Sequence, residues 1–235
     1  MNFKKFQYFS NMTVKDKKRS LGLFLIKYLK NNQVIGLGSG STVKEALNPI
    51  AKHIKENNLN IQFISSSVES TKLCKSFDLD CQDISTSRHL DWTFDGVDYI
   101  GKDFLIKGGG AALYREKILA KVSREYFIIA DDSKLKSQKN SKIAVPVEVS
   151  SFSLDYVILE LRKLGAIKTE IREVNNSQKT ITDNGNYLID CYFEKIGSNL
   201  EQKIKLITGV IESGIFANLN PQVLIANDLE VYKLK

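Results

Sequence analysis

The chain has 235 residues, of which 43% are apolar, so it can bury a substantial core and does not have the composition of a disordered protein. Its 34 Lys and Arg residues outnumber its 27 Asp and Glu residues, and the net charge of +7 favours anionic partners such as phosphorylated metabolites, nucleic acid or an acidic membrane surface. The densest basic runs, 15–19 and 134–142, contain no interleaved aromatic residues, which favours solvated lysines over a nucleic-acid surface.

The first part of the chain alternates between helical and strand patterns. Apolar residues recur at helical spacing over 21–29, and a short apolar strand then breaks into glycine and hydroxyl residues within 34–42. A second helical pattern covers 43–57, a second strand 60–67 and a third helical pattern 68–77. This alternation predicts a parallel sheet with crossover helices.

The alternation continues for two further strands, a helix and another strand. The strand patterns cover 90–98 and 104–110, the helical pattern 111–122 and the last strand 126–132. A polar, lysine-rich segment at 133–142 interrupts the pattern, and it is the best candidate for a connection between two domains.

The rest of the chain indicates a second, smaller unit. Its patterns suggest a small αβ sandwich and cover 143–149, 153–165, 168–174, 180–193, 200–210 and 211–216. An Asn-Gly pair at 184–185 predicts a hairpin turn between two β-rich runs, and the final run, 222–234, can return to the first sheet. The sequence therefore predicts an α/β protein with a main domain at 1–140, completed by 218–235, and a small αβ domain at 141–217.

The turn GLGSGST at 36–42 has the features of a phosphate site. Its glycines allow close backbone approach, its hydroxyl groups can donate hydrogen bonds, and the following helix offers unpaired N–H groups. It lacks the lysine of a Walker A loop, and Ser41 stands where a dinucleotide fingerprint needs glycine. A phosphate outside a dinucleotide is therefore favoured over the alternative, a plain glycine-rich turn.

Glu116 lies in the helical pattern 111–122 among apolar neighbours. The residues three and four positions away are all alanine or leucine, so packing would tend to bury the carboxylate. Burial in apolar surroundings makes a carboxylate a stronger base, which general-base catalysis needs. Arg115 has equally apolar neighbours, so a buried stem with an exposed head group is the alternative for either side chain.

Charged residues also follow two of the predicted strands. Asp95 and Asp98 come at the end of one strand, where parallel α/β sheets bind their ligands, although an Asp-Gly turn or a magnesium site would use the same residues. Lys107 ends the next strand and directly precedes the glycines 108–110. This lysine and the glycine N–H groups could stabilise a substrate oxyanion, and a solvated lysine beside a flexible turn is the alternative.

The three cysteines favour a reducing compartment. Cys74, Cys81 and Cys191 are odd in number and form no CxxC pair, whereas disulfide frameworks and zinc sites both use closer, repeated spacings. The two histidines are isolated, so they cannot supply a histidine-based metal site. The first residues lack the apolar core of a signal peptide, and no apolar run approaches the ~18–20 residues needed to span a bilayer. We therefore expect a cytoplasmic protein.

Seven motifs in this order resemble the A type of ribose-5-phosphate isomerase: GLGSGST, SSSVEST, DGVD, IKGGGAALYREKILA, IADDSK, PVEV and TDNGN. The resemblance extends from about Lys18 to the C-terminus. It implies a Rossmann-like parallel-sheet domain with a second, smaller ferredoxin-like αβ domain, usually in homodimers or homotetramers. It also implies a cofactor-independent enzyme of the non-oxidative pentose phosphate pathway, which interconverts ribose 5-phosphate and ribulose 5-phosphate through an enediolate.

The resemblance implies a role for each candidate residue. Glu116 would move the proton between C1 and C2, Asp95 and Asp98 would assist ring opening and proton transfer at the oxygens, and Lys107 would stabilise the enediolate. It implies no metal ligand. The implied substrate-binding residues are Lys18, Ser39, Gly40, Ser41, Thr42, Gly96, Val97, Gly108, Gly109, Gly110 and Lys134.

The sequence departs from the family pattern in one loop. The family usually reads DGADE, and this chain reads DGVDY, so Val97 and Tyr99 replace alanine and glutamate. The first eleven or so residues form an extension to which we assign no role. The main rival to an isomerase is a non-catalytic sugar-phosphate sensor on an isomerase-like scaffold, which would keep the phosphate turn but would not need Glu116 and Lys107.

Overall fold

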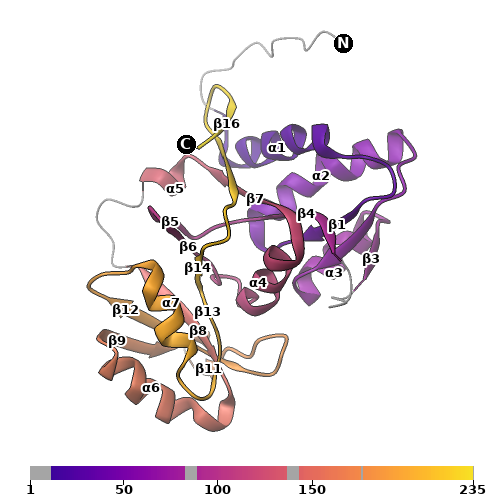
Figure 1. Ribbon diagram of the computed structural model, residues 1–235. Helices are drawn as coiled ribbons and strands as arrows, with labels where there is room; N and C mark the ends of the chain where they lie inside the picture. Colours follow the sequence, from indigo (N-terminus) through magenta and orange to yellow (C-terminus); the bar gives the residue numbers. More distant parts are fainter. Residues whose placement is uncertain (1–11, 83–88, 137–142, 176, 235) are drawn as a thin grey trace.

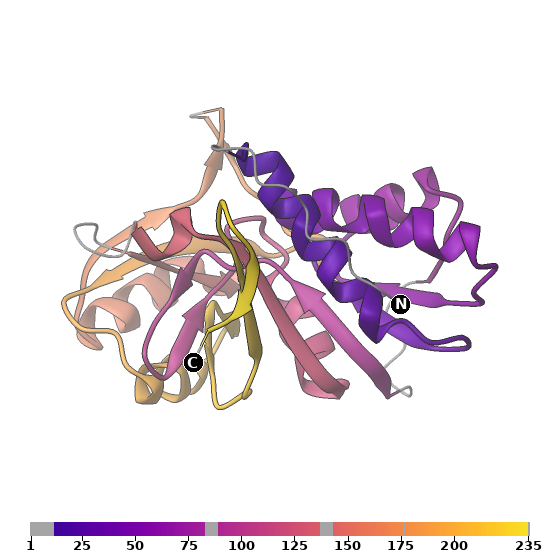
Figure 2. The ribbon, with the colours of Figure 1, turned by 90° about the horizontal axis from the view of Figure 1, so that it is seen from above.

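The computed structural model describes residues 12–82, 89–136, 143–175 and 177–234. The N-terminal extension and the second half of the lysine-rich segment, 137–142, lie outside these described residues. The first half of that segment forms a short helix, α5 (Ser133–Lys136). The chain folds into a mixed α/β structure with a larger, mostly parallel sheet and a smaller antiparallel sheet beside it (Figures 1 and 2), which confirms the predicted α/β class.

The larger sheet has seven strands in the order β16-β15-β7-β4-β1-β2-β3, and all neighbours are parallel except the pair β15–β16. Its strands are β1 (Val34–Leu37), β2 (Gln62–Ser65), β3 (Asp80–Gln82), β4 (Leu90–Asp95), β7 (Ser123–Asp131), β15 (Gln222–Ala226) and β16 (Val231–Lys233). β15 lies beside β7, with Leu224 opposite Ile129. The predicted return of the final run to the first sheet is therefore confirmed.

Helices cover both faces of this sheet because the strands are apolar on both sides. They are α1 (Val14–Leu25), which continues into η1 (Ile26–Tyr28), α2 (Gly40–Glu56), α3 (Val68–Ser76) and α4 (Leu113–Val122). Along β7, Phe127 and Ile129 pack in one cluster with apolar residues of α1 and α2, whereas Ile128 packs with Leu113 of α4. This alternation puts α1 and α2 on one face, side by side in Figure 2, and α4 on the other.

The smaller sheet has four antiparallel strands in the order β13-β8-β12-β9. Its elements are β8 (Ala144–Val149), η3 (Ser151–Ser153), α6 (Leu154–Lys163), β9 (Ala166–Ile171), β12 (Tyr187–Phe193), α7 (Ser198–Lys205) and β13 (Val210–Ser213). Buried Val145, Val147 and Ile189 of the sheet pack with Val157 of α6 and Ile204 of α7. A two-stranded ribbon, β10 (Glu173–Val174) with β11 (Gln178–Lys179), extends from this part.

A third, three-stranded sheet links the two parts. It consists of β5 (Tyr99–Ile100), β6 (Phe104–Ile106) and β14 (Ile215–Ala217), with β6 in the centre. β14 directly follows β13 of the smaller sheet, yet Phe216 pairs with Leu105 of β6. Through β14 the chain thus passes from the smaller sheet back toward the larger part. The division into two domains at residues 140 and 217 stays a prediction.

The first helix begins earlier than the sequence pattern predicts. It starts at Val14 rather than near residue 21, and the side chain of Thr13 accepts a hydrogen bond from the Asp16 N–H at 3.1 Å. The early turns are polar, and Lys17 is nevertheless buried because it pairs with Asp132 at 2.8 Å and Asp228 at 3.0 Å.

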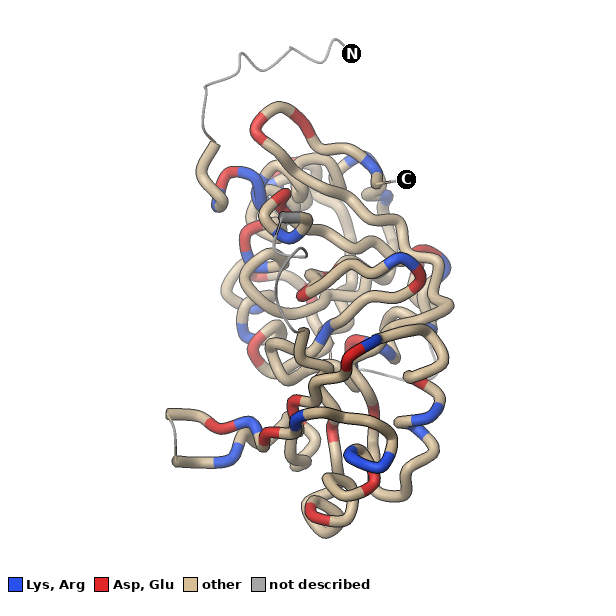
Figure 3. Tube along the Cα trace, turned by 90° about the vertical axis from the view of Figure 1, so that its left-hand side faces the viewer, with Lys and Arg blue, Asp and Glu red and all other residues tan. Residues whose placement is uncertain are grey.

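Charges of both signs are spread along the trace, with Lys and Arg interspersed among Asp and Glu (Figure 3). Lys15 and Arg19 of the first predicted basic run both pair with Glu45. Within the described ranges, no helix combines the length and the apolar character that crossing a bilayer requires.

Candidate active site

The candidate site lies at the carboxyl ends of β1 and β4, which run parallel with Leu37 opposite Phe94. Asp95 is the last residue of β4, and its carboxylate accepts a hydrogen bond from the Ser39 N–H at 3.2 Å. Gly38 allows this approach, since a Cβ atom there would lie 2.2 Å from the Asp95 Cγ. The glycine-rich turn and the aspartate strand therefore meet, as the sequence predicts.

Lys107 lies between two carboxylates at the centre of the site. Its Nζ is 2.9 Å from Asp95 Oδ2 and 3.3 Å from Glu116 Oε2, and it donates a hydrogen bond of 2.6 Å to the Gly96 carbonyl. Lys107 and Glu116 are each 3% exposed, and Asp95 is fully buried. The predicted burial of Glu116 is confirmed, and the alternative of a solvated lysine at position 107 is wrong.

The second oxygen of Glu116 is held by a serine that the sequence places in the phosphate turn. The Ser39 hydroxyl donates to Glu116 Oε1 at 2.6 Å, across 77 positions of sequence. This contact joins the turn before α2 to the first turn of α4. No local pattern in the sequence could reveal it, because periodicity reports only on neighbours along the chain.

The electrostatics of the cluster follow from one cation facing two buried carboxylates. Burial and the nearby Glu116 carboxylate raise the pKa of Asp95 to about 7. Burial opposes the charge of Lys107, but Asp95 and Glu116 outweigh it, and the pKa of the ammonium lies above its usual value. Burial, with Asp95 and Glu116 nearby, also keeps the pKa of Tyr126 well above normal. Lys107 is therefore a permanent cation, and Asp95 can exchange a proton near neutral pH.

Asp98 differs from Asp95 because it is exposed. Its carboxylate accepts a hydrogen bond of 2.8 Å from the Gly109 N–H, so it contacts the glycine loop that follows Lys107. Within this loop Gly108 has φ +102°, and Ala111 has φ +62°, a left-handed conformation that is unfavourable for alanine. Such backbone strain persists only where surrounding contacts hold it, which is common at functional sites.

Of the two lysines predicted to bind the phosphate, Lys18 contacts the glycine-rich turn. α2 begins at Gly40, and the Lys18 Nζ from α1 donates to the Ser41 hydroxyl at 2.9 Å. A cation, hydroxyl groups and a helix N-terminus thus share one place. Lys134 lies in α5, which follows β7 at the same edge of the sheet.

The DGVDY loop has a structural explanation for both of its unusual residues. Val97 is buried in the cluster of Ile100 and Leu105, so its side chain belongs to the core. The Tyr99 ring stacks on Phe104 with centroids 6.0 Å apart and packs against the core of the smaller sheet. Tyr99 therefore serves packing between the β5–β6 hairpin and the smaller sheet.

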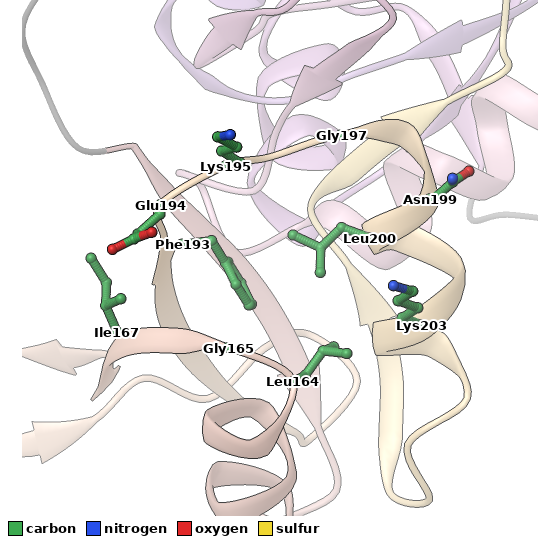
Figure 4. Close-up of a pocket in the computed structure, with 10 residues that line it drawn as sticks. All are labelled: Leu164, Gly165, Ile167, Phe193, Glu194, Lys195, Gly197, Asn199, Leu200 and Lys203. Carbon is green, nitrogen blue, oxygen red and sulfur yellow. The ribbon is translucent and has the colours of Figure 1, made fainter.

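A separate pocket of about 340 Å³ lies in the smaller part of the molecule, between the end of β12 and α7 (Figure 4). Phe193 and Leu200 point toward one another across it, and Lys195 and Lys203 lie at its rim. None of its lining residues belongs to the Lys107 cluster. In the part of the chain that the structure describes, no group of three or more His, Cys, Asp or Glu side chains is placed to hold a metal ion.

The chain is similar to one family over most of its length. The family model for ribose 5-phosphate isomerase A (phosphoriboisomerase A) matches residues 62–230. Ribose-5-phosphate isomerase A 1 of Oceanobacillus iheyensis is 36% identical over 225 residues, which cover 94% of this chain and 99% of the relative.

Two solved structures are similar in fold and sequence. Ribose 5-phosphate isomerase A of Methanocaldococcus jannaschii aligns with a TM-score of 0.87 and 32% identity, over 95% of this chain and 100% of the other. A D-ribose-5-phosphate isomerase in complex with phospho-erythronic acid aligns with a TM-score of 0.88 and 31% identity, over the same shares of the two chains.

Proposed function

The chain belongs to the ribose 5-phosphate isomerase A family, and from this premise we propose that its Lys107 cluster interconverts D-ribose 5-phosphate and D-ribulose 5-phosphate. The chain is an enzyme, an aldose–ketose isomerase. Its substrate is a small phosphorylated sugar, and the reaction belongs to the non-oxidative pentose phosphate pathway. The single observation that carries the proposal is the buried Lys107 between Asp95 and Glu116.

Glu116 is the base in this proposal. Moving a carbonyl from C1 to C2 requires removal of the C2 proton and its return to C1, and a buried carboxylate with one oxygen held by Ser39 is suited to carry that proton. The intermediate is an enediolate, whose negative charge develops on oxygen. Lys107 lies 3.3 Å from Glu116, so its ammonium is placed beside the base and can stabilise that oxygen.

The two aspartates divide the remaining proton transfers. Asp95, with its pKa raised to about 7, can give a proton to a sugar oxygen and take it back. Asp98 is exposed and contacts the Gly109 N–H, which suits it to assist opening of the sugar ring at the mouth of the site. The sugar's phosphate lies at the α2 N-terminus, with Lys18 and Ser41 as donors and Lys134 as a further basic residue.

The rival reading, a sugar-phosphate sensor without catalysis, is not favoured. A sensor would need the phosphate turn, but it would gain nothing from a cation and two carboxylates buried together, which is costly to maintain. A cytoplasmic location is part of the proposal, and it is supported by three thiols that form no disulfide. A homodimer or homotetramer is proposed from the family resemblance alone.

The function is tested by turnover of the purified chain in the presence of a chelator. We expect interconversion of ribose 5-phosphate and ribulose 5-phosphate, and a Glu116→Gln substitution should lower kcat by about 10²–10⁴-fold, because an amide cannot accept the C2 proton. Glutamine still accepts the Ser39 hydrogen bond, so the Kd for ribose 5-phosphate should change little.

Glu56→Gln is the matched control, because Glu56 is an exposed carboxylate on α2. Its kcat should equal that of the unsubstituted chain. A folded sample without turnover would refute the enzyme assignment, and near-normal kcat in Glu116→Gln would refute the choice of base.

A further inference from the structure

The glycine loop after Lys107 is held by an arginine from the smaller part of the molecule. Arg172 lies between β9 and β10, and its Nη1 donates to the carbonyl oxygens of Gly108 at 2.6 Å and Gly109 at 3.3 Å. Its own N–H donates to the Leu188 carbonyl of β12 at 2.9 Å. The side chain therefore reaches from the smaller sheet to the backbone beside the catalytic lysine.

Asp190 of β12 fixes the orientation of this arginine. Arg172 Nε donates to Asp190 Oδ2 at 2.8 Å, and Nη2 donates to Oδ1 at 2.5 Å. Such a two-point contact sets the plane of the guanidinium as well as its position. With 19% of the Arg172 side chain exposed and 18% of Asp190, the pair lies at the edge of the site, where solvent can reach it.

Because the peptide bonds of the loop are trans, fixing the Gly108 and Gly109 carbonyls also fixes the direction of the N–H groups of Gly109 and Gly110. In each peptide unit the carbonyl and the next N–H point in opposite directions, and no cis peptide occurs in the described residues. The Gly108 carbonyl points at Arg172, and the N–H of Gly109 accordingly points at Asp98, 2.8 Å away. The Gly109 carbonyl also points at Arg172, so the N–H of Gly110 points away from it.

Gly110 lies beside Ser39, the residue that holds Glu116. A Cβ atom on Gly110 would be 3.3 Å from the Ser39 hydroxyl oxygen, and that hydroxyl donates to Glu116. Within the described part of the chain, no hydrogen bond from the Gly110 N–H to a protein acceptor is found. A backbone donor is thus available beside the Ser39–Glu116 pair, in a loop in which Ala111 has a strained, left-handed conformation.

We propose that Arg172 is a positioning residue of the isomerase: together with Asp190 it fixes the Gly108 and Gly109 carbonyls, so that the Gly110 N–H donates to the same enediolate oxygen that Lys107 stabilises. This inference rests on the proposed function, because it needs an enediolate beside Glu116. Without Arg172, the flexible glycine loop would not keep the Gly110 N–H in this direction. The guanidinium, bound to the carbonyl side of these peptides, also polarises the N–H on their opposite side.

Arg172→Ala tests the proposal. We expect kcat to fall by about 10–100-fold, less than for direct loss of an oxyanion donor, while KM changes by less than about threefold. Because Arg172 lies at the solvent edge, added guanidinium ion at millimolar concentration should restore several-fold of the lost kcat. A merely structural role would not produce rescue at concentrations that leave unfolding unaffected.

Arg162→Ala is the matched control, because this exposed arginine of α6 donates only to the Thr169 side chain. It should leave kcat unchanged and show no response to guanidinium ion. Arg172→Lys is the second variant, since it keeps the charge and the stem but cannot contact both carbonyls and both Asp190 oxygens. Its kcat should lie between those of the alanine variant and the unsubstituted chain.

The proposal is overturned by unchanged kcat in either Arg172 variant, by a loss expressed only in KM, or by absence of guanidinium rescue in a folded Arg172→Ala sample. Failure of the proposed function has a different signature: the folded, unsubstituted chain shows no turnover, or Glu116→Gln keeps a normal kcat, whatever residue stands at position 172. The two variants measured in one experiment therefore separate the two failures.

Discussion

At the scale of single residues, the single positive charge of Lys107 faces two carboxylates. Both Asp95 and Glu116 lie within 3.3 Å of its ammonium, in a place that water does not reach. One cation cannot neutralise two buried anions, so a proton bound by the cluster lowers its energy. Burial and Glu116 raise the pKa of Asp95 to about 7, which makes Asp95 the group that holds this proton.

The raised pKa of Asp95 predicts a loss of stability as the pH rises. Its usual pKa of 3.8 applies in the unfolded chain, and about 7 applies in the folded one. Between these values the folded chain binds more protons, so the free energy of unfolding should fall as the pH rises from about 4 to about 7, by up to about 1.4 kcal/mol per unit. Asp95→Asn removes this titration.

The measurement is urea unfolding of both chains at several pH values. The free energy of the unsubstituted chain minus that of Asp95→Asn should decrease up to about pH 7 and stay level above it. Asp103→Asn is the control, because Asp103 is exposed in the turn between β5 and β6. A difference that rises with pH over this interval would contradict the assignment of the proton to Asp95.

At the scale of elements, the turn at 182–186 connects three segments. The buried Glu148 of β8 accepts hydrogen bonds through Oε1 from Thr182, Asn184 and Asn186, each at 2.9 Å. From the same turn, Asp183 Oδ2 accepts from the Val68 N–H at the start of α3. The Asn184 side chain and the Asp183 carbonyl also accept from Arg115 of α4. One hairpin turn of the smaller part thus fixes two helices of the larger one.

Glu148→Gln should loosen this turn. A neutral amide oxygen is a weaker acceptor for three donors than a carboxylate, and the NH₂ group would take the place of the buried Oε2, which accepts no hydrogen bond from the described residues, so we expect a loss of about 2–3 kcal/mol in unfolding free energy. Amide hydrogen exchange at 182–186 should become faster than in the rest of the smaller sheet. Both are measured on the intact chain.

Glu160→Gln provides the comparison, because Glu160 makes only a partly exposed pair with Lys163 at 2.7 Å. Its unfolding free energy should change by less than about 0.5 kcal/mol. Unchanged exchange at 182–186 in Glu148→Gln would mean that Glu148 does not hold the turn.

The elements show which parts of the fold can be predicted from sequence. Strands buried on both faces and the Asn-Gly turn carry local signals, and the turn forms as predicted, with Gly185 at φ +78°. The start of α1 does not carry one, because its first turns are polar and Lys17 is buried only through partners at 132 and 228. The pairing of β14 with β6 joins positions more than a hundred residues apart, which periodicity does not report.

The same limit applies to the candidate site. Asp95, Lys107 and Glu116 stand out because each follows a strand end or lies on an apolar helix face. Arg172 does not stand out, and Ser39 does so only as a residue of the phosphate turn, since their contacts with Gly108 and Glu116 span 64 and 77 positions. Side chains that act through distant partners become visible only when the chain is folded.

At the scale of the whole molecule, Lys117 connects α4, the helix that carries Glu116, to the smaller part. It follows Glu116 in α4, is 1% exposed, and its Nζ contacts Glu201 of α7 at 2.6 Å and Glu212 of β13 at 3.0 Å. It also donates to the Ser213 and Ile215 carbonyls, each at 2.7 Å. The Phe216 ring lies near both lysines, 4.7 Å from Lys117 Nζ and 5.7 Å from Lys107 Nζ.

Lys117→Met should destabilise the whole chain by about 3–5 kcal/mol, because it removes the buried cation that two carboxylates and two carbonyls share. Lys121→Met, at an exposed position of the same helix, should change the unfolding free energy by less than about 0.5 kcal/mol. The double variant Lys117→Met with Glu212→Leu should be more stable than Lys117→Met alone, because it also removes a buried carboxylate that has lost one of its two cations and keeps only Lys205, at 3.2 Å. Urea unfolding of these chains, and of Glu212→Leu alone, measures these effects and completes the double-mutant cycle. Additive losses in the double variant would mean that the two side chains contribute separately and that Lys117 does not join α4 to β13.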